Sequence, residues 1–322
     1  MAINTKFQTK SDVSVFIGTE VTMGTATLAG GTWHEMPVVD YSIADISSPL
    51  TVAPFRSNSF AQQESMAKHD RTQQMYEISL TMQGTAAAID RICGALFEDS
   101  SQPNILLGSS PVTTTFDDGE TNAIPVTILL DNGGTNDNDI YYTSCMCTSM
   151  ELSYSIGGDG GALQLVANFV TGYNPTTGTL TPSSSTSTLG TVFNIYDLSA
   201  PTLGGNELLI MGFSLNISRA VNRVSYDSDN QFKPLGYSIG GYEVTGSINC
   251  KRDANSASVA TNSSAGIALS VGDGTFAVTA NDTMVEDLSV DLADEGWKHD
   301  FSYRCFYDDS AETNAVVTID TA

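Results

Sequence analysis

Positive charge is scarce in this sequence of 322 residues, which has 13 Lys and Arg against 37 Asp and Glu and a formal net charge of −24. A protein that holds nucleic acid by its phosphates needs a basic patch, so the composition argues against direct nucleic-acid binding. Charged residues of either sign make up only 16% of the chain, below the quarter that is typical of soluble domains. Solubility or a saline environment also explains such acidity, and composition alone favours this simpler explanation.

Histidine and tryptophan are equally rare. The chain has three histidines, His34, His69 and His299, and none of them lies in a motif for acyl transfer or metal binding. We therefore expect each to be a surface histidine, and we expect neither an enzyme nor a cofactor. The two tryptophans, Trp33 and Trp297, are too few for an aromatic carbohydrate-binding platform.

The cysteines and the apolar runs indicate neither a set of disulfides nor a membrane span. The five cysteines form an odd set without disulfide spacing, and we expect them to be buried small apolar residues, although Cys145 and Cys147 could also form a metal pair. The segment Asp131–Asp139 could bind calcium, but a hairpin turn explains the same residues better. No signal peptide is visible, and no apolar run approaches the roughly 18 residues of a membrane span.

What the chain does contain is a pattern of elements that occurs twice, over Trp33–Gly172 and Glu207–Asp308. Each copy has an alternating strand, a long polar arm, a second alternating strand, a stretch of small residues and a closing pair of strands. Thr85–Phe97 has the clearest helical spacing, with Thr85 able to cap it, and Asp253–Asn262 is a weaker helical match at the corresponding place. This order of elements predicts an internal duplication.

Three segments resemble a family of phage tail tube proteins. The opening VFIGTEVTMGT (Val15–Thr25) resembles the N-terminal signature of that family. The segment Met211–Ile248 resembles its second half, in which a strand, a variable polar arm and a second strand follow one another. The closing DLSVDLADEGWKHDFSYRCFYDD (Asp287–Asp309) also fits.

The resemblance implies a mainly β fold with a flanking helix. Tandem β-sandwich domains would have sheets that join into a ring-forming barrel. The first domain would be 1–172, with an N-terminal arm and the helix 85–97, followed by a linker 173–190 and a second domain 191–322. Three or six chains would form each ring, and the rings would stack into a tail tube.

The resemblance also implies partners and location. The tube would assemble in the host bacterial cytoplasm around a tape-measure protein, and it would end at tail terminator and distal tail proteins. DNA would pass through the lumen without specific binding, and neither a membrane nor a cofactor would be involved.

Alternation gives each predicted strand an apolar face and a small polar face. The polar faces carry the acids that would line the lumen: Glu77, Glu151, Glu243, Asp287 and Asp291. Such a lining repels phosphate and lets DNA slide. The same residues could equally belong to an ordinary solvated outer face.

Basic residues gather in the two polar arms. They are Arg56, Lys68 and Arg71 in the first arm and Arg219, Arg223 and Lys233 in the second. The arms could dock on the acidic surface of a neighbouring subunit between rings. Chance placement on exposed loops explains them as well.

Two other classes of protein remain open at this point. A decoration or tail-spike component of a virion would share the composition, and so would a secreted adhesin or carbohydrate-binding module. The missing signal peptide and the two tryptophans count against the adhesin.

Overall fold

The structure, a computed structural model, is mainly β with two helices in the residues it describes. The helices are α2 (Ala86–Leu96) and α3 (Ala254–Thr261). The described residues are 13–20, 24, 33–46, 48–51, 69–73, 75–96, 112–115, 125–132, 139–155, 161–178, 185–187, 189–194, 201–223, 234, 236–261, 267–273, 276–293, 296–306 and 315–320.

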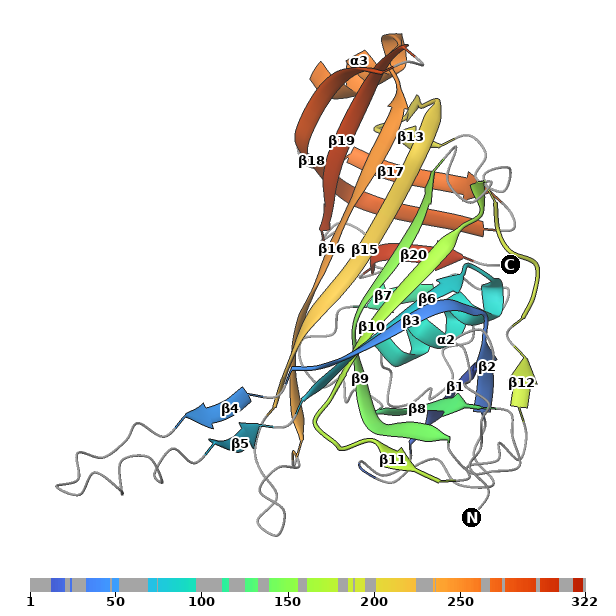
Figure 1. The fold of residues 1–322 in the computed structure, drawn as a ribbon. Helices are drawn as coiled ribbons and strands as arrows, with labels where there is room; N and C mark the ends of the chain where they lie inside the picture. The colour runs from blue at the N-terminus through green and yellow to red at the C-terminus, as the bar shows by residue number, and fades with distance from the viewer. Residues whose placement is uncertain are drawn as a thin grey trace, which may run out of the picture.

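One continuous antiparallel sheet, which we call the long sheet, runs through both halves of the chain (Figure 1). Every neighbouring pair in it is antiparallel. Its strands, in spatial order, are β3 (Val38–Asp45), β6 (Tyr76–Gln83), β10 (Gln164–Thr171), β9 (Ile140–Ser155), β15 (Ile210–Arg223), β16 (Tyr237–Lys251), β19 (Gly296–Phe306) and β18 (Phe276–Ala293).

Two smaller sheets are connected to the long sheet. Strand β9 belongs to the long sheet and to the first of them, and β18 belongs to the long sheet and to the second. The first is β12 (Ser185–Ser187), β2 (Trp33–Met36), β1 (Ser14–Thr19), β8 (Val126–Asp131), β9 and β11 (Thr176–Thr177). The second is β7 (Val112–Thr115), β20 (Ala315–Asp320), β18, β17 (Ile267–Asp273), β13 (Thr202–Leu203) and β14 (Asn206–Glu207). A separate hairpin of β4 (Ser48–Thr51) and β5 (His69–Gln73) projects from the body (Figure 1).

Alternation decides which face of the long sheet is buried. In β6, Ile78, Leu80 and Met82 are buried, Ser79 and Thr81 between them are half-buried, and Glu77 and Gln83 on either side are exposed. Buried side chains from seven of the strands join one apolar cluster that continues through both halves of the chain, and partly buried side chains of β3 pack against it. The opposite face therefore remains for water or for another molecule.

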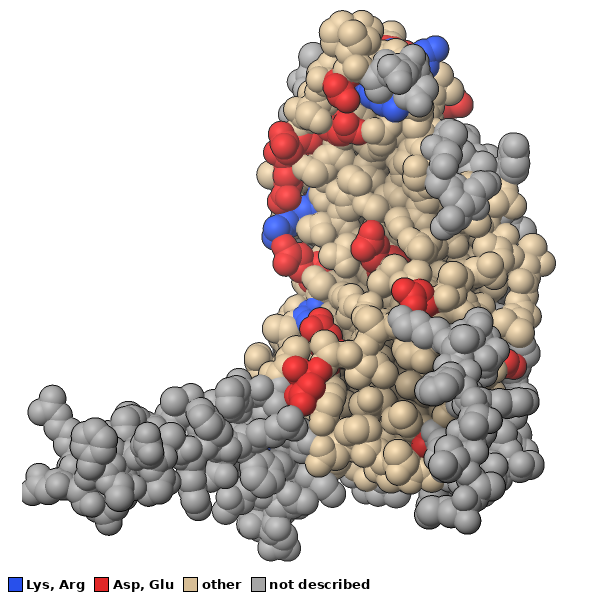
Figure 2. Space-filling model, in the orientation of Figure 1, with Lys and Arg blue, Asp and Glu red and all other residues tan. Residues whose placement is uncertain are grey.

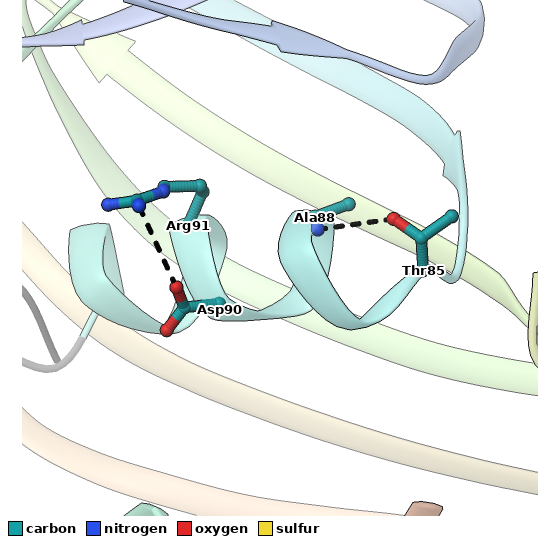
Figure 3. Close-up of polar contacts among 4 residues, drawn as sticks. All are labelled: Thr85, Ala88, Asp90 and Arg91. Carbon is teal, nitrogen blue, oxygen red and sulfur yellow. Dashed lines mark hydrogen bonds and ion pairs between the residues drawn. The ribbon is translucent and has the colours of Figure 1, made fainter. Parts of the chain in front are cut away.

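Helix α2 covers the apolar face where the sequence predicts it, and this prediction is confirmed. Thr85 caps the helix by accepting a hydrogen bond at its Oγ1 from the backbone N of Ala88, 3.2 Å away (Figure 3). Ile89, Ile92 and Leu96 are fully buried against the sheet. One turn on, the carboxylate of Asp90 lies 3.9 Å from the Arg91 guanidinium (Figure 3).

The two halves of the long sheet have the same strand order and the same irregularities. The first four strands run β3, β6, β10, β9, and the second four run β15, β16, β19, β18. An extra residue bulges from β3 at Val39 and from β15 at Met211, which lie 172 positions apart. A second bulge occurs at Thr148 in β9 and at Glu286 in β18, 138 positions apart.

The helix starts correspond as well. Asp253 caps α3 by accepting a hydrogen bond from the backbone N of Ser256, 168 positions after the Thr85 cap of α2. Corresponding backbone hydrogen bonds hold the strand ends, one from Gln83 N to Pro37 O (3.1 Å) and one from Lys251 N to Leu209 O (3.0 Å). Bulges and helix caps are local irregularities at single residues. Because they occur at matching positions in the two halves, they define which residue of one half corresponds to which residue of the other.

Several expected boundaries differ from the structure. The expected strands at Asp139–Cys147 and Ser149–Ile156 form a single strand, β9, because Thr148 between them is a bulge that does not end the pairing with β10. Strand β15 continues to Arg223, five residues into the segment Arg219–Ser238, which the sequence predicts to be a polar arm. The expected irregular arm at Ser47–Gln74 begins and ends as the hairpin of β4 and β5.

Candidate assembly surface

The five acids expected on the polar faces lie on one face of the long sheet. Cross-strand pairing shows this, because directly opposed residues point to the same side: Glu77 opposes Val170, and Val166 opposes Glu151. The same ladder continues from Glu151 through Asn216 and onward to the remaining acids. All five are exposed: Glu77, Glu151, Glu243, Asp287 and Asp291.

This polar face is small-residue-rich and acidic, but it is not free of cations. Arg304 lies between two acids, with its guanidinium 2.6 Å from Glu243 and 2.8 Å from Glu286. Lys251 and Lys298 oppose each other near one end. Figure 2 shows the result on the visible surface, where Asp and Glu side chains outnumber Lys and Arg. Two carboxylates neutralise the charge of Arg304.

The arm residues are placed less completely. Arg56, Lys68 and Lys233 lie outside the described residues, and of Arg71 only the backbone, in β5, is described. Arg223 is half-buried at the end of β15.

Arg219 is not an arm residue, and that prediction is corrected. Its side chain is buried, with a residue exposure of 5%, and its guanidinium donates to Cys147 O (3.0 Å), Tyr242 OH (2.9 Å) and Ala95 O (3.3 Å). Tyr242 in turn donates to Leu96 O. The last carbonyls of α2 are therefore capped from the second half of the chain, and a cation suits the negative end of the helix dipole.

Glu20, to which the sequence analysis gave no role, holds the bend of β9. Its carboxylate accepts hydrogen bonds from Thr127 Oγ1 (2.6 Å), Ser144 N (2.7 Å) and Ser144 Oγ (2.9 Å). Ser144 has φ of 50°, a left-handed conformation that non-glycine residues rarely adopt. Burial raises the pKa of Glu20 above its usual range, although the hydrogen bonds from Thr127 and Ser144 oppose the shift. Its place inside the opening motif is the signal that could have revealed this role.

The difference in unfolding free energy between Glu20→Gln and the parent chain is expected to favour the variant more at pH 7 than near pH 4.5. Because the folded-state pKa of Glu20 is raised, the native state retains a proton over a pH range in which the unfolded state has lost it. The contribution of Glu20 to the free energy of unfolding therefore falls as pH rises through the folded-state pKa. Glutamine does not titrate, yet it can accept from Ser144 N and donate to Ser144 Oγ.

The measurement is thermal unfolding of both proteins across this pH range. One pKa unit corresponds to about 1.4 kcal/mol in the difference between them. A stability difference that stays constant with pH would show that the carboxyl is not perturbed in the folded state.

The histidines are not surface residues where the structure describes them. His34 and His299 are both buried, so the expectation of surface histidines is wrong for these two, and the side chain of His69 is not described. Burial, together with the nearby Arg91, lowers the pKa of His34 to about 4, and burial also lowers that of His299. Both imidazoles are therefore neutral core groups at neutral pH.

All five cysteines are buried and free, as the sequence predicts. Burial raises the thiol pKa of Cys147, Cys250 and Cys305 to about 12, so these thiols stay protonated at neutral pH. Within the described part of the chain, no three His, Cys, Asp or Glu side chains gather as metal ligands would. No helix there has the length and apolar character needed to cross a membrane.

Comparison with known proteins identifies the family. The family model described as phage tail tube protein matches residues 10–304, which is nearly the whole chain. A search of curated proteins finds no match. The match spans the opening motif, the long sheet and both helices, and it supports a structural subunit of a virion tail over a secreted adhesin. The chain belongs to the phage tail tube protein family.

Proposed function

We propose that this chain is the self-assembling subunit of a bacteriophage tail tube. Its rings stack around a lumen that first holds the tape-measure protein and later conducts DNA. Tail terminator and distal tail proteins bind the two ends of the tube, and assembly takes place in the bacterial cytoplasm. The observation that carries this proposal is the exposed polar face of the long sheet, with its excess of carboxylates.

The charge of that face suits a conduit for DNA. The carboxylates of Glu77 in β6 and Glu151 in β9 are exposed, whereas the cation Arg304 is engaged by Glu243 and Glu286. A surface of net negative charge repels phosphate, and repulsion between the wall and the DNA prevents adsorption during passage. Serine and threonine side chains between the acids keep the face wet.

The organisation of the chain supports a ring of few subunits. The matching order, bulges and caps of the two halves support two tube-like units, with 1–172 and 191–322 as domains and 173–190 as linker. If each unit occupies one sixth of a ring, three chains complete it. The β4–β5 hairpin projects from the body (Figure 1), and in this proposal it reaches a stacked ring.

The test reverses charge on the polar face without disturbing the core. Glu77→Lys with Glu151→Lys is expected to leave tubes intact but to slow triggered DNA release from virions by roughly tenfold or more, because lysines bind passing phosphates. Added salt should restore part of the rate by screening. Electron microscopy of tubes and a release assay measure the two effects.

The matched control is Glu207→Lys, an exposed acid on β14 outside the long sheet. It changes the net charge without changing the polar face, and it should release DNA normally. Normal release from the Glu77→Lys, Glu151→Lys virions would place this face outside the lumen.

A further inference from the structure

The two halves of the long sheet meet at a junction that the chain makes with itself. Strand β9, the last strand of the first half, pairs antiparallel with β15, the first strand of the second half, from Ser149–Ser218 to Ser155–Gly212. Leu152 opposes Leu215 and Tyr154 opposes Phe213, with ring centroids 6.2 Å apart in the second pair. All four of these side chains are buried.

The same two kinds of edge occur again at the ends of the long sheet. By the correspondence of bulges, β18 is the counterpart of β9, and β3 is the counterpart of β15. Within the described residues, β3 pairs only with β6, and the part of β18 from Asp287 to Ala293 pairs only with β19. The outer edge of β18 thus corresponds to the edge of β9 that makes the internal junction, and the outer edge of β3 corresponds to the edge of β15 that makes it.

The side chains at the β18 edge are apolar where the internal junction is apolar. Val290 and Leu292 correspond to Leu152 and Tyr154, 138 positions earlier, and yet they are 48% and 61% exposed. Val39, on the β3 edge, is 68% exposed. Exposed apolar side chains on an unpaired strand edge invite another strand, and monomeric proteins avoid them.

We propose that β18 of one chain pairs with β3 of a second copy, reproducing between chains the junction that β9 and β15 make within one chain. This inference rests on the proposed ring assembly and names its contact. The constant offsets of 138 and 172 residues fix the register: Val290 opposes Ile43 and Leu292 opposes Tyr41, as Leu152 opposes Leu215 and Tyr154 opposes Phe213. On the polar face, Asp291 then opposes Ser42.

Charge disfavours one of the two neighbouring registers. Shifting by two residues in one direction would set Asp291 directly opposite Asp40, and like charges in direct opposition destabilise a sheet. The inferred register avoids this contact and buries Val290 and Leu292 against partly buried side chains of β3.

The geometry of the contact gives a ring rather than a pair. The two edges differ, so each copy offers β18 to one neighbour and β3 to the other, which is a head-to-tail contact. Each chain contributes one internal β9–β15 junction and one equivalent β18–β3 junction with its neighbour, so a closed ring contains twice as many such junctions as chains. Closure also leaves no free edge on the long sheet.

Cross-linking between engineered cysteines tests the register. Asp291→Cys with Ser42→Cys, treated with a short thiol-reactive cross-linker, is expected to yield covalent oligomers that end in a closed ring. The native cysteines are buried and should contribute little background. Asp291→Cys with Ala44→Cys, shifted by one same-face position, should give roughly tenfold less product if the register is unique.

The chain contains its own positive control. Ser153 and Ser214 oppose each other in the internal junction, so Ser153→Cys with Ser214→Cys should cross-link within one chain under the same conditions. If this control reacts and electron microscopy shows tubes, but the Asp291→Cys, Ser42→Cys pair does not cross-link, the junction is refuted while the tube function stands. If no rings or tubes form from the unmodified chain, the proposed function fails with it.

A second variant tests the apolar contact. Val290→Lys with Leu292→Lys should leave the monomer folded, because both side chains are exposed in it, and should abolish rings in size-exclusion chromatography and microscopy. Leu189→Lys, at another exposed leucine outside the long sheet, should assemble normally. Rings formed by the Val290→Lys, Leu292→Lys variant at the parental concentration would overturn the proposal.

Discussion

Gly246→Ala is expected to destabilise the chain by about 3 kcal/mol or more, at the upper end of the cost of overpacking a core. Gly246 lies in β16, between Leu215 of β15 and Tyr303 of β19. A methyl group there would overlap the carbonyl oxygen of Ser214 and the ring of Tyr303. The carbonyl belongs to a paired strand and the tyrosine is fully buried, so neither can move aside cheaply.

The counterpart positions explain why this site needs glycine. In the first half of the long sheet, Ile78 takes the place of Gly246, and Phe169 takes the place of Tyr303. The second half thus has a smaller residue on β16 and a larger one on β19 than the first half has on β6 and β10. The hydroxyl of Tyr303 uses the freed space to donate to Ser214 O at 2.8 Å.

Gly241→Ala is the matched control. It lies in the same strand, with open space around the site of the added methyl group, and should change the free energy of unfolding by no more than about 0.5 kcal/mol. Thermal unfolding measures both variants. In a double-mutant cycle, Tyr303→Phe removes one of the overlapping atoms, and a coupling of about 0.5 kcal/mol or more is expected. Equal stabilities for Gly246→Ala and Gly241→Ala would contradict the packing described here.

The parts of this fold that the sequence predicts are those determined by local periodicity. Alternation in Met75–Gln83 identifies β6 and its exposed Glu77, and the spacing of Ile89, Ile92 and Leu96 identifies α2. The family is also accessible from the sequence, through the motif that contains Glu20. Each of these signals lies within a segment of one or two elements.

What the sequence does not predict depends on contacts between distant segments. His34 and His299 look like polar surface residues, but the folded chain buries both of them. The bend of β9 at Ser144 depends on a carboxylate 124 positions away, which no local pattern encodes. Strand pairing also decides that the two halves share one sheet, since the β9–β15 contact is invisible to periodicity.

Arg219→Met is expected to cost about 3 kcal/mol, because it leaves buried carbonyl groups without donors. The guanidinium of Arg219 reaches Cys147 in β9 and Ala95 in α2, while its own strand, β15, belongs to the second half. One side chain therefore ties the helix of the first half to the junction of the long sheet. Lysine in its place has a single nitrogen that cannot reach all three acceptors, so Arg219→Lys should recover only part of the loss.

Arg252→Met is the control for loss of a cation, because Arg252 is exposed just after β16, with its guanidinium carbon 5.7 Å from the centroid of the Trp297 ring. Its effect should stay below about 1 kcal/mol. Hydrogen exchange adds a local measurement: in Arg219→Met the amides of the last turn of α2 should exchange faster, while those of α3 should not change. If Arg219→Met and Arg252→Met lose the same stability and α2 stays protected, Arg219 is not what holds the helix to the sheet, and its burial reflects packing of its aliphatic stem alone.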